Sequence, residues 1–146
     1  MPGCDSGAVI LSWLSPRLQH HAAVARKIHL SLLFRFAEPP LNDPAKLRDA
    51  MHEKSCCIGH YEGGLEWDRR DAFIAAANEA VDTPDPAPWH AVNAILIVGD
   101  VAMVHIENIW LGMHFDDTLT LLKHENRWII VSKVFSSDQQ SEPQLG

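Results

Sequence analysis

The sequence has few cysteines, no long apolar run and no basic cluster. Each absence argues against one class of structure or partner. It holds 3 cysteines in 146 residues, and Cys56 and Cys57 are adjacent. Neighbouring Cβ atoms in a strand point apart, so we expect no disulfide framework and a reducing, cytoplasmic compartment. No run approaches the ~18 apolar residues of a membrane span, so we expect no membrane partner. A net charge of −7 without a basic cluster argues against nucleic acid.

Sequence motifs for the commoner catalytic and cofactor chemistries are also missing. There is no GxSxG nucleophile elbow, no GxGxxG phosphate loop, and no HExxH or CxxC metal motif. Gly63–Gly64 is typical of a hairpin turn instead, and cysteines on an apolar strand are usually just buried. We therefore expect no cofactor and no resident metal.

Alternating apolar residues between Trp89 and Phe135 predict consecutive β-strands. In the strand after Asp100, one face carries Ala102, Val104, Ile106, Asn108 and Trp110. After Leu111–Gly112, a second strand carries Phe115, Asp117, Leu119 and Leu121 on one face. A two-residue hairpin loop then pairs Trp110 with Met113 and Val104 with Leu119, which brings the apolar faces together. We assign that face to the interior.

Upstream of these strands the pattern is mainly helical. We predict helices over residues 16–36, 44–52 and 69–81, with a short strand at 55–61 and a turn at 62–64. Helices followed by strands are typical of an α+β domain with helices packed on one face of an antiparallel sheet.

Several residues of the strand region carry a family resemblance. They are Gly99–Asp100, Ala102, Trp110, Gly112, Phe115, Asp117, Leu119, Leu121, Trp128, Ile130, Lys133 and Phe135, joined upstream by Asp43, Leu47, Ala50, His52 and residues 60–65. The segment resembles the SnoaL-like and "putative lumazine-binding" families of the nuclear transport factor two-like superfamily. The resemblance implies a cone-shaped curved antiparallel sheet, about four long strands plus a short N-terminal hairpin, wrapped around three helices. It also implies a pocket inside the cone and a homodimer through the outer sheet face. We expect one domain over residues 17–136, an extension at 1–16 and a tail at 137–146.

Two residues are candidates for acid–base chemistry in such a pocket. Asp117 shares the inward face with apolar neighbours, which disfavours the charged form of a carboxylate and poises it as an acid or base. Steroid-isomerase-like members of the superfold carry an oxyanion-donating aspartate near this position, which falls on Asp117 or, one residue later, on Thr118. Tyr61, the single tyrosine, could donate to a ligand carbonyl. For both, a purely structural role is the more frequent outcome.

The remaining pocket candidates are mostly aromatic, as ligand pockets usually are. They are His60, Trp67, Trp89, Asn108, Trp110, Phe115 and Trp128. Asn108 is a polar residue on the inward face, and a buried amide must find partners. Tryptophans at strand ends more often anchor a core or an interface.

A second polar group falls on the outer face. The predicted register places Glu107 opposite Asp116, with His105 and His114 nearby, and like charges directly opposed are unfavourable. A protonated histidine, a cation or a partner chain would relieve the repulsion. We favour ion pairs at a dimer interface over a metal site.

Three functions remain open. The first is a protein that binds a small hydrophobic or aromatic ligand without chemistry of its own, which we favour. The second is a cofactor-independent isomerase, cyclase or dehydratase that uses Asp117, and it needs a second polar group converging on the same point. The third is a dimerisation or adaptor domain whose cone is filled by side chains.

Overall fold

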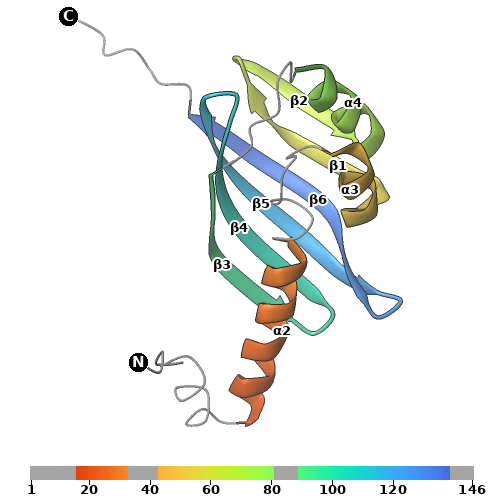
Figure 1. Cartoon of the computed structure of the whole chain (residues 1–146), viewed down its shortest axis with the longest axis vertical. Helices are drawn as coiled ribbons and strands as arrows, with labels where there is room; N and C mark the ends of the chain where they lie inside the picture. The colour runs from red at the N-terminus through yellow and green to blue at the C-terminus, as the bar shows by residue number, and fades with distance from the viewer. Residues whose placement is uncertain (1–15, 33–42, 81–88, 139–146) are drawn as a thin grey trace, which may run out of the picture.

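The computed structural model describes residues 16–32, 43–80 and 89–138, which form helices and one sheet (Figure 1). The helices are α2 (Pro16–Leu32), α3 (Pro44–Ala50) and α4 (Arg70–Ala80). The strands are β1 (Met51–Tyr61), β2 (Gly64–Arg69), β3 (His90–Val98), β4 (Val101–Trp110), β5 (Met113–His124) and β6 (Arg127–Asp138). None of these described helices has the length and apolar character that crossing a membrane requires.

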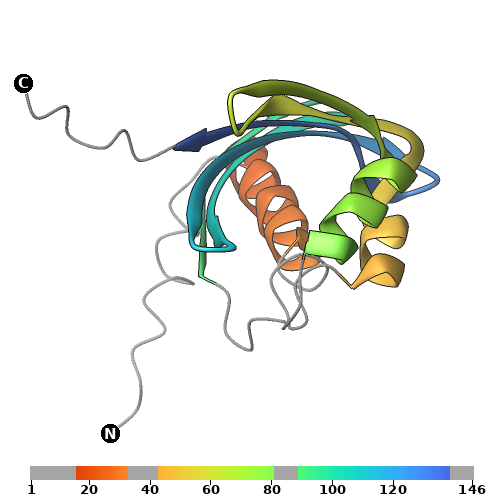
Figure 2. The same ribbon diagram turned by 90° about the horizontal axis from the view of Figure 1, so that it is seen from above.

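The strands form one curved sheet in the order β2-β1-β6-β5-β4-β3. Neighbouring strands are antiparallel, except that β1 runs parallel to β6. Figure 2 shows the sheet arching over the helices, with α2 under one part of the arch and α3 and α4 under another. The predicted α+β cone is therefore confirmed.

The hairpin between β4 and β5 sets the register on which the interior assignment depends. Leu111 and Gly112 have φ values of 50° and 76°, as a two-residue turn that follows the sheet twist requires. Trp110 pairs with Met113, and Val104 pairs with Leu119. The predicted register is confirmed.

Element boundaries differ from the prediction mainly at β1. The strand begins at Met51, four residues before the predicted Ser55, because Met51 is fully buried and pairs with Ile130. The helix α3 begins as predicted at Pro44, and the Asp43 carboxylate accepts a 2.9 Å hydrogen bond from the Ala45 N–H. The predicted end of the first helix, at residue 36, lies outside the described residues.

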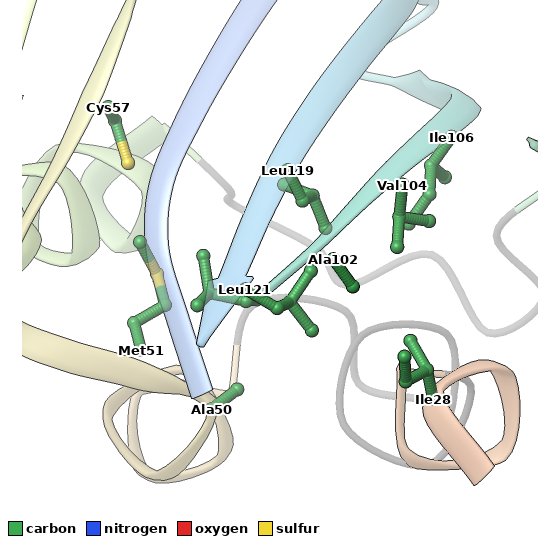
Figure 3. Close-up of a cluster of buried hydrophobic side chains, with 10 residues drawn as sticks. Ile28, Ala50, Met51, Cys57, Ala102, Val104, Ile106, Leu119 and Leu121 are labelled. Carbon is green, nitrogen blue, oxygen red and sulfur yellow. The ribbon is translucent and has the colours of Figure 1, made fainter. Parts of the chain in front are cut away.

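The core lies between the concave face of the sheet and the helices. Ile28 of α2 is fully buried and points toward the sheet, where Val104 and Leu119 are equally buried (Figure 3). Trp128 packs against the same core. Burial of these strand positions confirms which face of β4 and β5 is the interior.

A register shift in β6 changes which of its residues face inward. The pairing with β5 slips between Thr120 and Leu121, and an extra residue in one strand reverses the alternation beyond it. Ile130 is buried before the shift and Phe135 is buried after it, although simple alternation separates them. The shift also places Lys133 on the inner face, opposite Leu119.

Candidate functional site

The inner face of the sheet carries a compact polar cluster centred on Asp117. Asp117 is buried, and 6% of the residue is exposed. Its Oδ2 accepts a 2.9 Å hydrogen bond from the Asn108 side-chain amide and lies 3.1 Å from the Lys133 ammonium. An amide donor and a cation both stabilise an ionised carboxylate. The cluster is thus a buried charge pair with an amide, rather than a carboxyl among apolar neighbours.

Lys133 is a partner of Asp117 that the sequence pattern did not predict. Its side chain is 15% exposed, and its ammonium lies 5.0 Å from the Phe73 ring centroid and 5.8 Å from that of Phe135. Aromatic faces attract such a cation. Uninterrupted alternation put Lys133 on the opposite face from Ile130, and only the register shift in β6 brings it inside. No signal in the sequence locates that shift.

Aromatic side chains share the inner face with the polar cluster, since Phe115 pairs with Asn108 and Phe135 pairs with Asp117. Phe115 stacks on Tyr61 at a centroid distance of 6.3 Å, and it meets the edges of Trp110 at 6.0 Å and Phe135 at 6.2 Å. Such pairs favour offset or edge-to-face geometry. Burial, followed by the nearby charges of Glu62 and Glu66, raises the pKa of Tyr61, so its phenol keeps its proton at neutral pH. These rings form an apolar surface next to the Asp117–Lys133 ion pair.

Three buried polar atoms at this end of the sheet lack a hydrogen-bond partner among the described residues. They are Asp117 Oδ1, Trp110 Nε1 and His90 Nδ1. His90 pairs directly with Asn108 across β3 and β4, so it faces inward beside the cluster. Buried polar groups in native proteins almost always have a protein, water or ligand partner. This end of the sheet therefore offers one acceptor, one donor and one imidazole nitrogen for further hydrogen bonds.

Of the predicted pocket residues, the structure brings Asn108, Trp110, Phe115, Tyr61 and Asp117 together and places the others elsewhere. Because side chains alternate along β1, the inward position of Tyr61 turns His60 outward, where it is exposed. Trp67 pairs with Ile58 on the same outer face and is 66% exposed. Trp89 is 48% exposed and lies against His114.

Two further candidate residues, Trp128 and Thr118, lie away from the polar cluster. Trp128 faces inward but pairs with Lys123 at the opposite end of β5 and β6 from Asp117. It belongs to the core rather than to the cluster. Thr118, the alternative to Asp117, is exposed.

The thiol of Cys57 is not a nucleophile at neutral pH. The side chain is 1% exposed, and burial, partly offset by Lys133, raises the pKa of the thiol from 9.0 to about 12. The thiolate is the reactive form, so Cys57 serves packing.

Comparisons with known proteins agree on the fold. Residues 41–136 match the sequence model of the family described as "Putative lumazine-binding". An NTF2-like protein of unknown function from Silicibacter pomeroyi is 38% identical, with a TM-score of 0.69 over 83% of this chain and 98% of that chain. No curated protein matches the sequence.

More distant solved structures share the same architecture. An NTF2-like protein of unknown function from Shewanella baltica is 23% identical, with a TM-score of 0.63 over 86% of this chain and 98% of that chain. One from Methylobacillus flagellatus is 20% identical, with a TM-score of 0.65 over 86% of this chain and 96% of that chain. These two likenesses concern the fold alone.

Proposed function

This chain belongs to the "Putative lumazine-binding" family within the NTF2-like fold, and from that premise we propose that it binds a small planar aromatic ligand against Asp117. The single observation that carries the proposal is the inward carboxylate, which has one oxygen held by Asn108 and Lys133 and the other without a partner among the described residues. A ligand N–H or O–H donor complements that second oxygen.

The surroundings indicate which ligand chemistry fits. Phe115, Tyr61 and Trp110 supply ring faces and edges for stacking. The Trp110 indole N–H supplies a donor for a ligand carbonyl. A ring that carries both an N–H donor and a carbonyl acceptor, such as a cyclic amide or imide, matches this set. Lumazine, a pteridine with such groups, is the natural first probe.

Calorimetric titration with lumazine and with its N-methylated analogue tests the proposal. A hydrogen bond to a charged group contributes about 1.5–3 kcal/mol and one to a neutral group about 0.5–1.5 kcal/mol. Asp117→Asn keeps an acceptor oxygen and removes its charge, so we expect it to weaken binding by the difference, about 1–1.5 kcal/mol or roughly 5- to 12-fold. N-methylation removes the ligand donor and should weaken binding to the unaltered protein by roughly 10- to 150-fold. Asp100→Asn, an exposed carboxylate in the β3–β4 turn, is the matched control and should bind normally. Equal binding by the Asp117 and Asp100 variants would sink the proposal.

A second candidate is a cofactor-independent acid–base enzyme of the isomerase, cyclase or dehydratase type. The observation in its favour is that His90 Nδ1 is buried without a partner among the described residues, on the strand position opposite Asn108. Asp117 and His90 would then be the two converging titratable groups that such chemistry needs. A ligand found by titration should be converted by the unaltered protein and not by His90→Gln. Recovery of unchanged ligand from the unaltered protein leaves binding as the function.

We also propose a homodimer through the outer face of the sheet. Leu96 and Met103 are directly paired there and are 59% and 46% exposed, and Val98 and Val101 beside them are 68% and 39% exposed. Contiguous exposed apolar side chains mark interaction surfaces. Light scattering should give twice the mass of one chain, and Leu96→Asp should halve it. Leu111→Asp, at an exposed hairpin position, is the control that should leave the mass unchanged.

A further inference from the structure

We propose that Glu107, His114 and Asp116 bind a divalent transition-metal ion, of which zinc is representative, on the outer face of the sheet. Each residue offers one ligand atom, and these atoms all lie within 4.8 Å of one another. Zinc binds imidazole nitrogen and carboxylate oxygen at about 2.0–2.2 Å. Ligand atoms around such an ion are therefore roughly 3–4 Å apart, a distance that side-chain rotation reaches without moving the strands.

The two carboxylates are oriented toward His114. Glu107 Oε2 accepts a 2.5 Å hydrogen bond from the Asn93 amide, which leaves Oε1 at 3.6 Å from His114 Nε2. Asp116 Oδ1 lies 2.6 Å from His105 Nε2, which leaves Oδ2 at 3.8 Å from His114 Nδ1. Each carboxylate thus has one oxygen fixed by an outer neighbour and the other free to bind. Metal ligands are commonly held in this way by a second layer of hydrogen bonds.

The negative charge of the carboxylates around His114 also favours binding of a cation. Asp138 Oδ2 lies 3.7 Å from His114 Nδ1, so three carboxylates surround one imidazole. In the described part of the chain, the ion pairs of Glu107, Asp116 and Asp138 are all with histidines rather than with lysine or arginine. A divalent ion neutralises this group without requiring a protonated histidine. Imidazole with carboxylate is a donor set that zinc and its neighbours accept.

The site leaves room for exchange with solvent and for a further ligand. The side chains of His114 and Glu107 are 34% and 31% exposed, and that of Asp116 is 40% exposed. Three protein ligands with an open position are typical of exchangeable or reactive metal sites rather than closed structural ones. The group lies toward the end of β4, four residues or more beyond the apolar patch at Val101 and Met103. At about 3.4 Å per residue that is on the order of 14 Å, so the metal site lies beside this apolar patch rather than on it.

Metal titration of the untagged full chain tests the proposal. By calorimetry, Zn²⁺ should bind with one ion per chain, and Glu107→Gln and His114→Gln should each weaken it at least tenfold. Asn93→Ala removes only the outer hydrogen bond to Glu107. Outer partners of metal ligands contribute about 10- to 100-fold in affinity, so this variant should also weaken zinc binding. The matched controls are His124→Gln, at the end of β5, and Glu125→Gln, in the turn that follows. These two side chains form an exposed pair, with His124 Nε2 3.9 Å from Glu125 Oε1, and both variants should bind normally.

A measurement on the unaltered protein cannot be confounded by a variant that fails to fold. In the unaltered protein, one equivalent of Zn²⁺ should shift the imidazole NMR signals of His114 and His105 and leave those of His124 in place. No zinc binding at millimolar concentration, or binding that His124→Gln weakens as much as His114→Gln does, would overturn the proposal. Equal shifts at every histidine would do the same, because they indicate nonspecific surface binding.

Discussion

Removing the Lys133 ammonium should leave the Asp117 carboxylate buried without its cation. The two side chains are 15% and 8% exposed, and the charged atoms are 3.1 Å apart. Deleting one partner of a buried pair costs about 3–5 kcal/mol. The Asn108 amide still contacts Asp117 Oδ2, so we expect the lower end, about 3 kcal/mol, for Lys133→Met.

Urea unfolding followed by circular dichroism measures this effect. With a typical slope of about 2 kcal/mol per molar urea, the midpoint should fall by roughly 1.5 M. Lys123→Met is the matched control, because Lys123 is exposed on β5 and surface changes stay within about 0.5 kcal/mol. All proteins are compared at one concentration, since association shifts apparent stability.

The double variant Asp117→Asn/Lys133→Met separates the pair from the fold around it. Its loss should be smaller than the sum of the two single losses, by roughly 0.5–3 kcal/mol, as for residues in direct contact. A loss below about 1 kcal/mol for Lys133→Met, or strictly additive losses, would refute the view that these charges form one buried unit.

Two further predictions concern the walls of the cone. Gly59→Ala should destabilise by about 1–3 kcal/mol, because a Cβ there would lie 2.5 Å from Phe135 Cδ2; an unchanged melting temperature would contradict the packing described. Burial raises the pKa of the Cys57 thiol from 9.0 to about 12, so the stability that the neutral thiol contributes is complete below pH 9 and falls between about pH 9 and 12 by about 1.4 kcal/mol per pH unit. Urea midpoints at increasing alkaline pH should therefore fall less steeply for Cys57→Ala than for the unaltered protein. Parallel pH profiles would contradict a raised pKa of the Cys57 thiol.

The fold was predictable because local signals agreed with one another. The turn at Leu111–Gly112 and the alternation on either side of it fixed the β4–β5 register, and Val104, Leu119 and Leu121 are buried as that register requires. Burial of an apolar face specifies register strongly, since a slip by one residue would expose it.

The site was only partly predictable, because its key partner depends on an irregularity in the sheet. Asp117 and Asn108 could be placed on the inner face from alternation alone. Lys133 could not, because the register shift in β6 reverses the faces and leaves no residue-type signature at that point. His60 and Trp67 were expected at the pocket from their residue types, and strand parity placed them on the outer face.

The most direct test of the account is a crystal structure of the chain with the tightest-binding ligand from the titrations. We predict ligand density on the concave side of the sheet, with a donor atom within hydrogen-bonding distance of Asp117 Oδ1 and the ring against Phe115. Density instead in the open hollow lined by His60, Gly63, Ser137 and Asp138, with Asp117 Oδ1 met by protein side chains alone, would contradict the central claim.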